Sequence, residues 1–287
     1  QVELRIAAAL SKDKKMLEAY SRGEDLHRLT ASVITGKPPE EVTKSERQAA
    51  KACFSGDTEV LTPSGWVRFD RYDGVSPVAQ YASCGLLEFV KPLSFRWFEG
   101  RPLLRHESSG VDLCLTPDHE VVFVDRAGSL RKAASGRLSP RRVAGFVAAG
   151  EMSRRFVSEA PSRLLALLLC RGFKDGGSFC VRLPSGGLPR RFDGVVFSAE
   201  AGPEGVFLRL CGGEALRAAS RFLTEDLDVR WDCLGEVNAF AFLDELVRQA
   251  GNGGRRQRRG RAVVGKRSLA DFAQALAATS GIPSTLD

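Results

Sequence analysis

Cys53-Phe54-Ser55-Gly56-Asp57-Thr58-Glu59-Val60-Leu61-Thr62 is the stretch of sequence that decides the fold, and Thr116-Pro117-Asp118-His119 is its counterpart further along the chain. In the first stretch a cysteine precedes a Gly-Asp turn and then a strand in which apolar and polar residues alternate. In the second, a Thr-x-x-His pattern follows another strand of the same kind. Together they predict a β unit that carries a cysteine, a threonine and a histidine.

Short alternating segments continue from Cys53 to about residue 145 and predict that this unit is all-β. Gly85, Gly100 and Gly110 mark turns between the segments. The expected strands are 59–62, 66–69, 78–81, 89–95, 103–107, 111–115 and 121–124. Residues 128–142 are rich in Arg, Lys, Ser and Gly, so we expect a loop or a linker there.

The pairing of Cys53 with Thr116 and His119 closely resembles the N-terminal splicing half of an intein, a self-excising Hint domain. The resemblance implies an incomplete, all-β Hint splicing domain over 53–150. It also implies that the Cys53 thiol attacks the carbonyl carbon of Ala52 and converts the peptide bond between them into a thioester. This reaction uses no cofactor.

The resemblance assigns a role to each residue around that bond. His119 is the natural acid for the departing nitrogen, because an imidazole titrates near neutral pH. Thr116 can hydrogen-bond the strained peptide or the developing oxyanion, and Asp118 is expected to orient the histidine. A free cysteine is only a few per cent thiolate at neutral pH, so Cys53 needs such help.

The second half of splicing requires a terminal asparagine, usually after a histidine. The chain has only Asn238 and Asn252, and neither follows a histidine. We therefore expect the chain to be the upstream part of a precursor. Its partner would be the C-terminal part of the intein, supplied in cis or in trans.

Residues 1–52 are predicted to be helical, and Arg47 and Lys51, four residues apart, share one face of the third helix. Their pattern, with Glu3 and His27, resembles the palm-to-fingers passage of family A DNA polymerases, the DNA polymerase I type. The resemblance implies that Glu3 helps to exclude ribonucleotides and that His27, Arg47 and Lys51 contact the incoming dNTP. It implies DNA and dNTPs as partners and Mg²⁺ as the cofactor of the intact host enzyme. This segment alone lacks the catalytic aspartates, so it cannot polymerise.

Residues 151–287 mix helices and strands, and two apolar helices, 164–172 and 242–251, each end at a glycine. This pattern resembles a LAGLIDADG homing endonuclease of α+β fold. The metal-binding aspartates of that family correspond here to Arg171 and Ala250. A guanidinium repels a divalent cation and a methyl group supplies no ligand, so we expect that cleavage has been lost.

The bulk composition is that of an ordinary globular protein, with 287 residues, 43% hydrophobic residues and a formal net charge of +7. No apolar run approaches the length of a membrane span. Seven cysteines without a C-x-x-C pair favour a reducing, cytoplasmic location and no structural metal. The fold expected overall is multi-domain: a short all-α segment, the all-β domain and the α+β region.

Two other interpretations of the sequence stay open. The first is an active site-specific endonuclease, against which Arg171 and Ala250 argue. The second is a Hint autoprocessing domain of a different kind, in which residues 1–52 would belong to a signalling protein.

Overall fold

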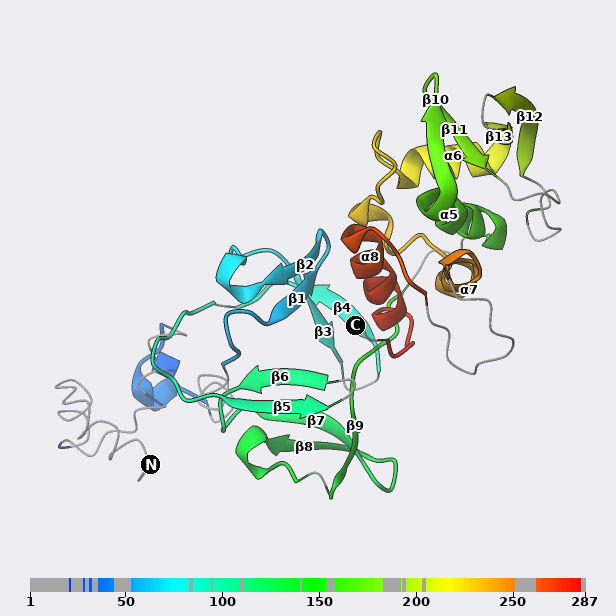
Figure 1. Ribbon diagram of the computed structural model, residues 1–287. Helices are drawn as coiled ribbons and strands as arrows, with labels where there is room; N and C mark the ends of the chain where they lie inside the picture. Colours follow the sequence, from blue (N-terminus) through cyan, green and yellow to red (C-terminus); the bar gives the residue numbers. More distant parts are fainter. Residues whose placement is uncertain are drawn as a thin grey trace. The chain divides into compact units, whose positions relative to one another are not determined.

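The computed structural model describes most of the chain from Cys53 onward, as helices and small antiparallel sheets (Figure 1). This agrees with the predicted mixture of β and α+β structure. The described residues are 21, 28, 31–32, 36–43, 53–82, 85–93, 95–108, 111–139, 141–153, 158–182, 192, 195–202, 205–250 and 262–284.

The chain divides into two compact units, and pieces of each alternate along the sequence. Among the described residues from Cys53 onward, the first unit contains 53–59, Arg68–Ser76 and Lys91–Val147. The second contains Val60–Val67, Pro77–Val90 and the residues from Ala148 to the end of the described part. The second unit therefore includes two pieces of the chain that precede residue 91, as well as the residues from Ala148 onward.

The apolar side chains of the Val60–Val67 piece explain why it packs with the second unit. Leu61 is 4% exposed and belongs to that unit's core, and Trp66 packs against the same core. The Trp66 indole N–H also donates to the carbonyl of Asp271 at 3.1 Å.

The described part of the first unit contains five strands. Strands β5 (Leu104–Ser108) and β6 (Val111–Leu115) form an antiparallel hairpin. A three-stranded antiparallel sheet has the order β8-β7-β9, formed by β7 (Glu120–Asp125), β8 (Leu130–Ala134) and β9 (Val143–Phe146). Two short 3-10 turns, η2 (Phe69–Arg71) and η3 (Ser135–Arg137), complete it.

The expected loop over 128–142 is wrong, because this region contains β8 and η3. Strand β8 has an exposed first half and no strong apolar alternation of its own. It forms because it pairs along the length of β7, whose Val121 and Phe123 are buried. The pairing is a long-range property that the local composition does not display.

The second unit begins with two hairpins, β1 (Glu59–Thr62) with β2 (Gly65–Arg68), and β3 (Val78–Tyr81) with β4 (Leu87–Val90). The expected strand 89–95 is wrong at both ends, since β4 starts earlier and stops at Val90. Pro92 follows two residues later and has no N–H for a ladder.

Elsewhere in the second unit, the residues that the structure describes form a four-stranded antiparallel sheet and four α-helices. The sheet has the order β10-β11-β13-β12. Its strands are β10 (Gly172–Asp175), β11 (Ser178–Arg182), β12 (Val196–Gly202) and β13 (Gly205–Gly212). The helices are α5 (Glu159–Arg171), α6 (Gly213–Phe222), α7 (Ala239–Ala250) and α8 (Arg267–Ala278).

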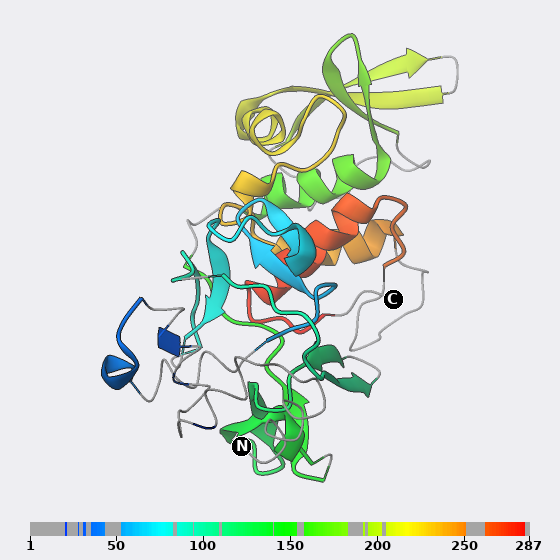
Figure 2. The same ribbon diagram turned by 90° about the vertical axis from the view of Figure 1, so that its left-hand side faces the viewer.

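The two predicted apolar helices are confirmed as α5 and α7, and they lie side by side in Figures 1 and 2. Six consecutive residues of α5, Leu164 to Leu169, are buried. The helix ends before Gly172, where a Cβ atom would lie 2.4 Å from the Leu168 carbonyl oxygen. Only glycine fits this close approach.

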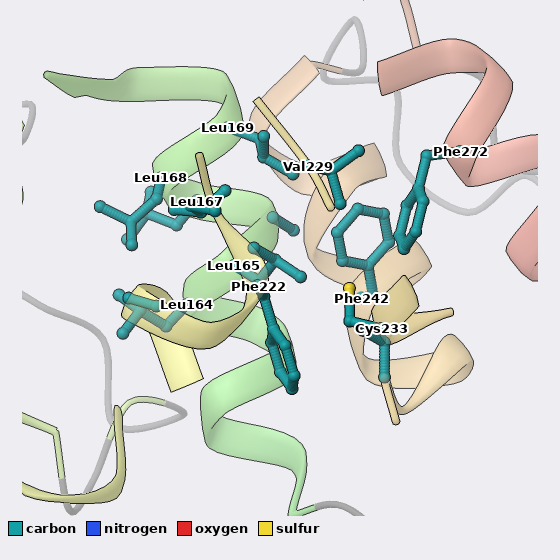
Figure 3. Close-up of a cluster of buried hydrophobic side chains, with 14 of the residues drawn as sticks. Leu164, Leu165, Leu167, Leu168, Leu169, Phe222, Val229, Cys233, Phe242 and Phe272 are labelled. Atoms are coloured by element: carbon teal, nitrogen blue, oxygen red, sulfur yellow. The ribbon is translucent and has the colours of Figure 1, made fainter. Parts of the chain in front are cut away.

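The core of the second unit lies between these helices and α8. Phe242 of α7 and Phe272 of α8 are fully buried and meet edge to face, with ring centroids 5.8 Å apart (Figure 3). Cys233 is buried beside them, and burial raises the pKa of its thiol to about 12, so it behaves as a small apolar side chain.

No helix in the described part of the chain is both long and apolar enough to span a bilayer.

Candidate active site

The segment that begins at Cys53 is fixed by the end of strand β6. Phe54 forms an isolated antiparallel bridge with Leu115. The Ser55 N–H donates to the Cys114 carbonyl at 2.9 Å, and the Thr116 N–H donates to the Cys53 carbonyl at 2.9 Å. Backbone hydrogen bonds therefore fix the Cys53 carbonyl and the two residues that follow it.

Thr116 also holds the other side of Cys53. Its side chain is 1% exposed, and its Oγ1 accepts a hydrogen bond from the Cys53 N–H at 3.2 Å. That N–H belongs to the peptide bond between Ala52 and Cys53. One buried threonine thus binds both the N–H and the carbonyl of Cys53, through its hydroxyl and its backbone.

His119 follows in the same turn and is positioned by its neighbours. Its N–H donates to the Thr116 carbonyl at 3.0 Å, which closes the turn. Its ring lies edge-on to Phe54, with centroids 4.3 Å apart. Its Nδ1 atom is buried and has no hydrogen-bond partner in the described part of the chain. A buried, unsatisfied ring nitrogen beside a cysteine is unusual and points to a role in chemistry.

The environment keeps both reactive groups neutral. Burial lowers the pKa of His119. The negative charge of Asp118 and a hydrogen bond with the Cys53 backbone raise this pKa, but by less. Burial raises the pKa of the Cys53 thiol, with Arg101 lowering it and Asp118 raising it further. At neutral pH the site therefore holds a thiol and an imidazole, rather than a thiolate and an imidazolium.

This protonation state refines what His119 can do. A neutral imidazole carries one ring proton and has one basic nitrogen, so His119 can accept the thiol proton as well as donate a proton. The arrangement suits a relay in which the thiol proton passes through the imidazole to another atom. Asp118 contributes through its charge, since it raises the pKa of both partners.

Four further residues at this site were missed by the sequence analysis: Phe54, Arg101, His106 and Ser135. Phe54 packs on the His119 ring, and Arg101 acts on the Cys53 thiol. The Ser135 hydroxyl and the His106 Nε2 are hydrogen-bonded at 2.7 Å. No spacing in the sequence reveals this pair, because it joins strand β5 to the separate turn η3.

The positions predicted from the endonuclease resemblance lie in the second unit. Arg171 is the last residue of α5, and its Nη2 donates to the carbonyl of Gln249 at 3.5 Å, next to Ala250 at the end of α7. Two carboxylates that lie close to these positions in the sequence are already paired: Asp175 with Arg209 at 2.5 Å, and Asp244 with Arg163. In the described part of the chain, no three His, Cys, Asp or Glu side chains gather in a way that could hold a metal.

The remaining predicted site residues lie outside the described residues: Ala52 at the junction, and Glu3, His27, Arg47 and Lys51. Their roles stay predictions.

Comparison with known proteins finds similarity to DNA polymerases over the first segment and, for two of the relatives below, over a longer stretch than that segment. Residues 1–56 match the family model of DNA polymerase family A. DNA polymerase I of Aquifex aeolicus is 62% identical over 104 residues, which are 34% of this chain and 16% of that protein. DNA polymerase I of Synechocystis is 40% identical over 78 residues (27% and 7%), and that of Pseudomonas aeruginosa is 46% identical over 56 residues (20% and 6%). The chain thus spans less than a fifth of each relative.

Proposed function

We propose that the chain from Cys53 onward is the N-terminal part of an intein that interrupts a family A DNA polymerase. The observation that carries this is the pair of hydrogen bonds between Thr116 and the backbone of Cys53, together with the buried His119 Nδ1, which has no partner in the described part of the chain. The family match also ends at residue 56, just after this cysteine. The proposed catalytic site therefore lies where the family-model match ends, although the similarity to the DNA polymerase I of Aquifex aeolicus extends over 104 residues.

The proposed reaction is an acyl shift from nitrogen to sulfur. The Cys53 Sγ forms a bond to the carbonyl carbon of Ala52, and the bond from that carbon to the Cys53 nitrogen breaks. His119 takes the thiol proton and delivers it to the departing nitrogen, so the product is an isomer of the starting chain. No cofactor, oxidant or metal enters this step.

Thr116 supports the step by fixing the reacting peptide. Its hydroxyl oxygen holds the Cys53 N–H while its backbone N–H holds the Cys53 carbonyl, so rotation about this residue is restricted. Holding reacting groups in one geometry lowers the entropic part of the barrier. The thioester is less stable than the amide, so it will accumulate only when a second nucleophile traps it.

An added thiol provides the test. We expect that incubating the purified chain with dithiothreitol splits it into residues 1–52 and residues 53–287, visible as two bands on a denaturing gel. Samples without thiol should stay largely intact. Thiol-independent cleavage, or no cleavage of a folded chain, would contradict the proposal.

The segment before the junction is proposed to belong to the host enzyme, which performs template-directed DNA synthesis after splicing. In that enzyme Glu3 would discriminate against ribonucleotides, and His27, Arg47 and Lys51 would contact the incoming dNTP. Mg²⁺ is the proposed cofactor of the complete polymerase, and its partners are DNA, dNTPs and the C-terminal part of the intein. This polymerase-like segment also argues against a Hint domain from a signalling protein.

Residues 151–287 are proposed to be an endonuclease-like region that no longer cleaves. Arg171 and Ala250 stand where the endonuclease family has its metal-binding carboxylates, and Asp175 and Asp244 are engaged by arginines. A magnesium site for phosphodiester cleavage requires oxygen ligands that are free to bind it.

We therefore expect that the chain does not cut a plasmid that carries the uninterrupted polymerase junction, at magnesium concentrations up to about 10 mM. The measurement is conversion of supercoiled to linear plasmid, with a commercial restriction enzyme as positive control. Site-specific cutting that EDTA abolishes would support the active-endonuclease alternative.

A further inference from the structure

The turn that carries His119 is held from behind by η3. The Ser135 N–H donates to the His119 carbonyl at 2.7 Å, and the Gly136 N–H donates to the Pro117 carbonyl at 2.7 Å. These two carbonyls flank Asp118, so consecutive donors of η3 fix the turn on both sides. In the β7–β8 pairing Glu120 faces Ala134, and the hydrogen bond between Ser135 and His119 adds the next pair to this register.

The Ser135 hydroxyl links this turn to the other sheet of the first unit. It is hydrogen-bonded to the His106 Nε2 at 2.7 Å, and the serine is 1% exposed. His106 lies on β5, opposite Leu113 of β6. Strand β6 also holds the Cys53 segment, as described above, and Figure 1 shows β5 and β6 beside β7. The Ser135–His106 hydrogen bond thus links the β5–β6 hairpin, which holds the Cys53 segment, to η3, which holds the turn with His119.

Gly136 leaves no free space between η3 and the turn. A Cβ atom at this position would lie 3.2 Å from the Pro117 carbonyl oxygen and 3.3 Å from the Pro117 Cβ. Both contacts are tighter than ordinary van der Waals distance, and both involve the turn that carries His119. A side chain here would push that turn by a few tenths of an ångström.

We propose that His106, Ser135 and Gly136 form a positioning clamp, which sets the place of the His119 imidazole relative to the Cys53 peptide. The clamp touches neither the thiol nor the scissile bond, so its members are positioning residues. Its effect on rate rests on the acyl shift proposed above. Displacement of a catalytic group by about 1 Å can cost about a hundredfold in rate, so a clamp of this kind has large consequences.

Gly136→Ala is the first test, with Gly145→Ala as its matched control. Gly145 lies on β9 of the same unit, and a Cβ there meets nothing within 4 Å. We expect Gly136→Ala to slow thiol-induced cleavage at Cys53 by roughly ten- to a hundredfold, and Gly145→Ala to stay within about twofold of the parent chain. Equal rates for Gly136→Ala and the parent would overturn the proposal.

His106 provides a second test that depends on chemistry rather than on space. His106→Leu removes the partner of the Ser135 hydroxyl, whereas His106→Gln can place an amide near the position of Nε2. We expect His106→Leu to slow cleavage and His106→Gln to restore a good part of the rate. A pure loss of stability would lower the melting temperature of both variants and would show no such rescue, which would overturn the proposal.

NMR of the histidine rings makes the test independent of cleavage. The chain has three histidines, and the ring of His119 lies 4.3 Å from that of Phe54, so its signals depend on its position. We expect these signals to shift in Gly136→Ala and not in Gly145→Ala. If the parent chain never cleaves, the acyl-shift proposal fails and the ring signals alone decide the clamp: unshifted signals in Gly136→Ala refute it.

Discussion

Cys53→Ala is expected to abolish the thiol-dependent release of residues 1–52 completely. The methyl side chain cannot attack a carbonyl carbon, so the proposed first step has no nucleophile at residue 53. The Thr116 hydrogen bonds involve only the backbone of residue 53, so they persist in the variant. The loss should therefore be chemical and not structural.

Cys114→Ala is the control for this variant. Cys114 lies in the same unit, is also free and half-buried, and contributes its backbone carbonyl to the Cys53 segment. Because alanine retains that carbonyl, we expect cleavage at nearly the parent rate. The amount of released fragment is measured on a denaturing gel over a day. Residual thiol-dependent cleavage in Cys53→Ala would mean that another group starts the reaction.

His119→Ala is expected to reduce the rate constant of cleavage by about a hundred- to ten-thousandfold, the usual contribution of a well-placed acid or base. In the proposed reaction His119 passes the thiol proton to the departing nitrogen, and its buried Nδ1 has no hydrogen-bond partner in the described part of the chain. Without it, a neutral thiol must attack a stable amide with only water to move the proton. His119→Asn, which keeps a polar side chain in the cavity, should recover little of the rate.

The pH dependence of the parent chain tests the same relay. Burial holds the pKa of His119 below the ordinary histidine value and that of the Cys53 thiol above the ordinary cysteine value. Both groups are neutral between these two values, so the rate should be nearly constant there. As the pH falls through the pKa of His119, the ring gains a proton, cannot accept one from the thiol, and the rate falls. His119→Ala should lose this acidic decline; a decline that survives in the variant would assign it to another group.

The sequence predicted strands best where the alternation is strong and turn residues bound it. Strands β3 (Val78–Tyr81) and β6 (Val111–Leu115) have the predicted limits. It failed at β8, which consists of Leu, Arg, Lys and Ala and is stabilised by its pairing with β7. The sequence does not display the grouping of Val60–Val67 with the second unit, in which the Trp66 indole N–H donates to the carbonyl of Asp271, 205 positions away.

The candidate site shows the same limit at the level of single residues. The sequence pattern selected Cys53, Thr116 and His119, and the structure brings Thr116 into contact with Cys53 through two hydrogen bonds. The sequence pattern did not select Ser135. This residue lies in a segment interpreted as a loop or a linker, and its hydroxyl is hydrogen-bonded to His106, 29 positions earlier in the chain. The sequence also could not predict how burial sets the protonation of the thiol and the imidazole, since that depends on the packed environment.

Mass spectrometry of the fragment released by 2-mercaptoethanesulfonate tests the central claim most directly. The account predicts a fragment of residues 1–52 that carries the added thiol as a thioester on the Ala52 carboxyl group, together with a second fragment that begins at Cys53. Such an adduct forms only from an acyl group already transferred to sulfur. A folded chain that stays intact, or a fragment that ends at another residue or as a free acid from the start, would contradict it.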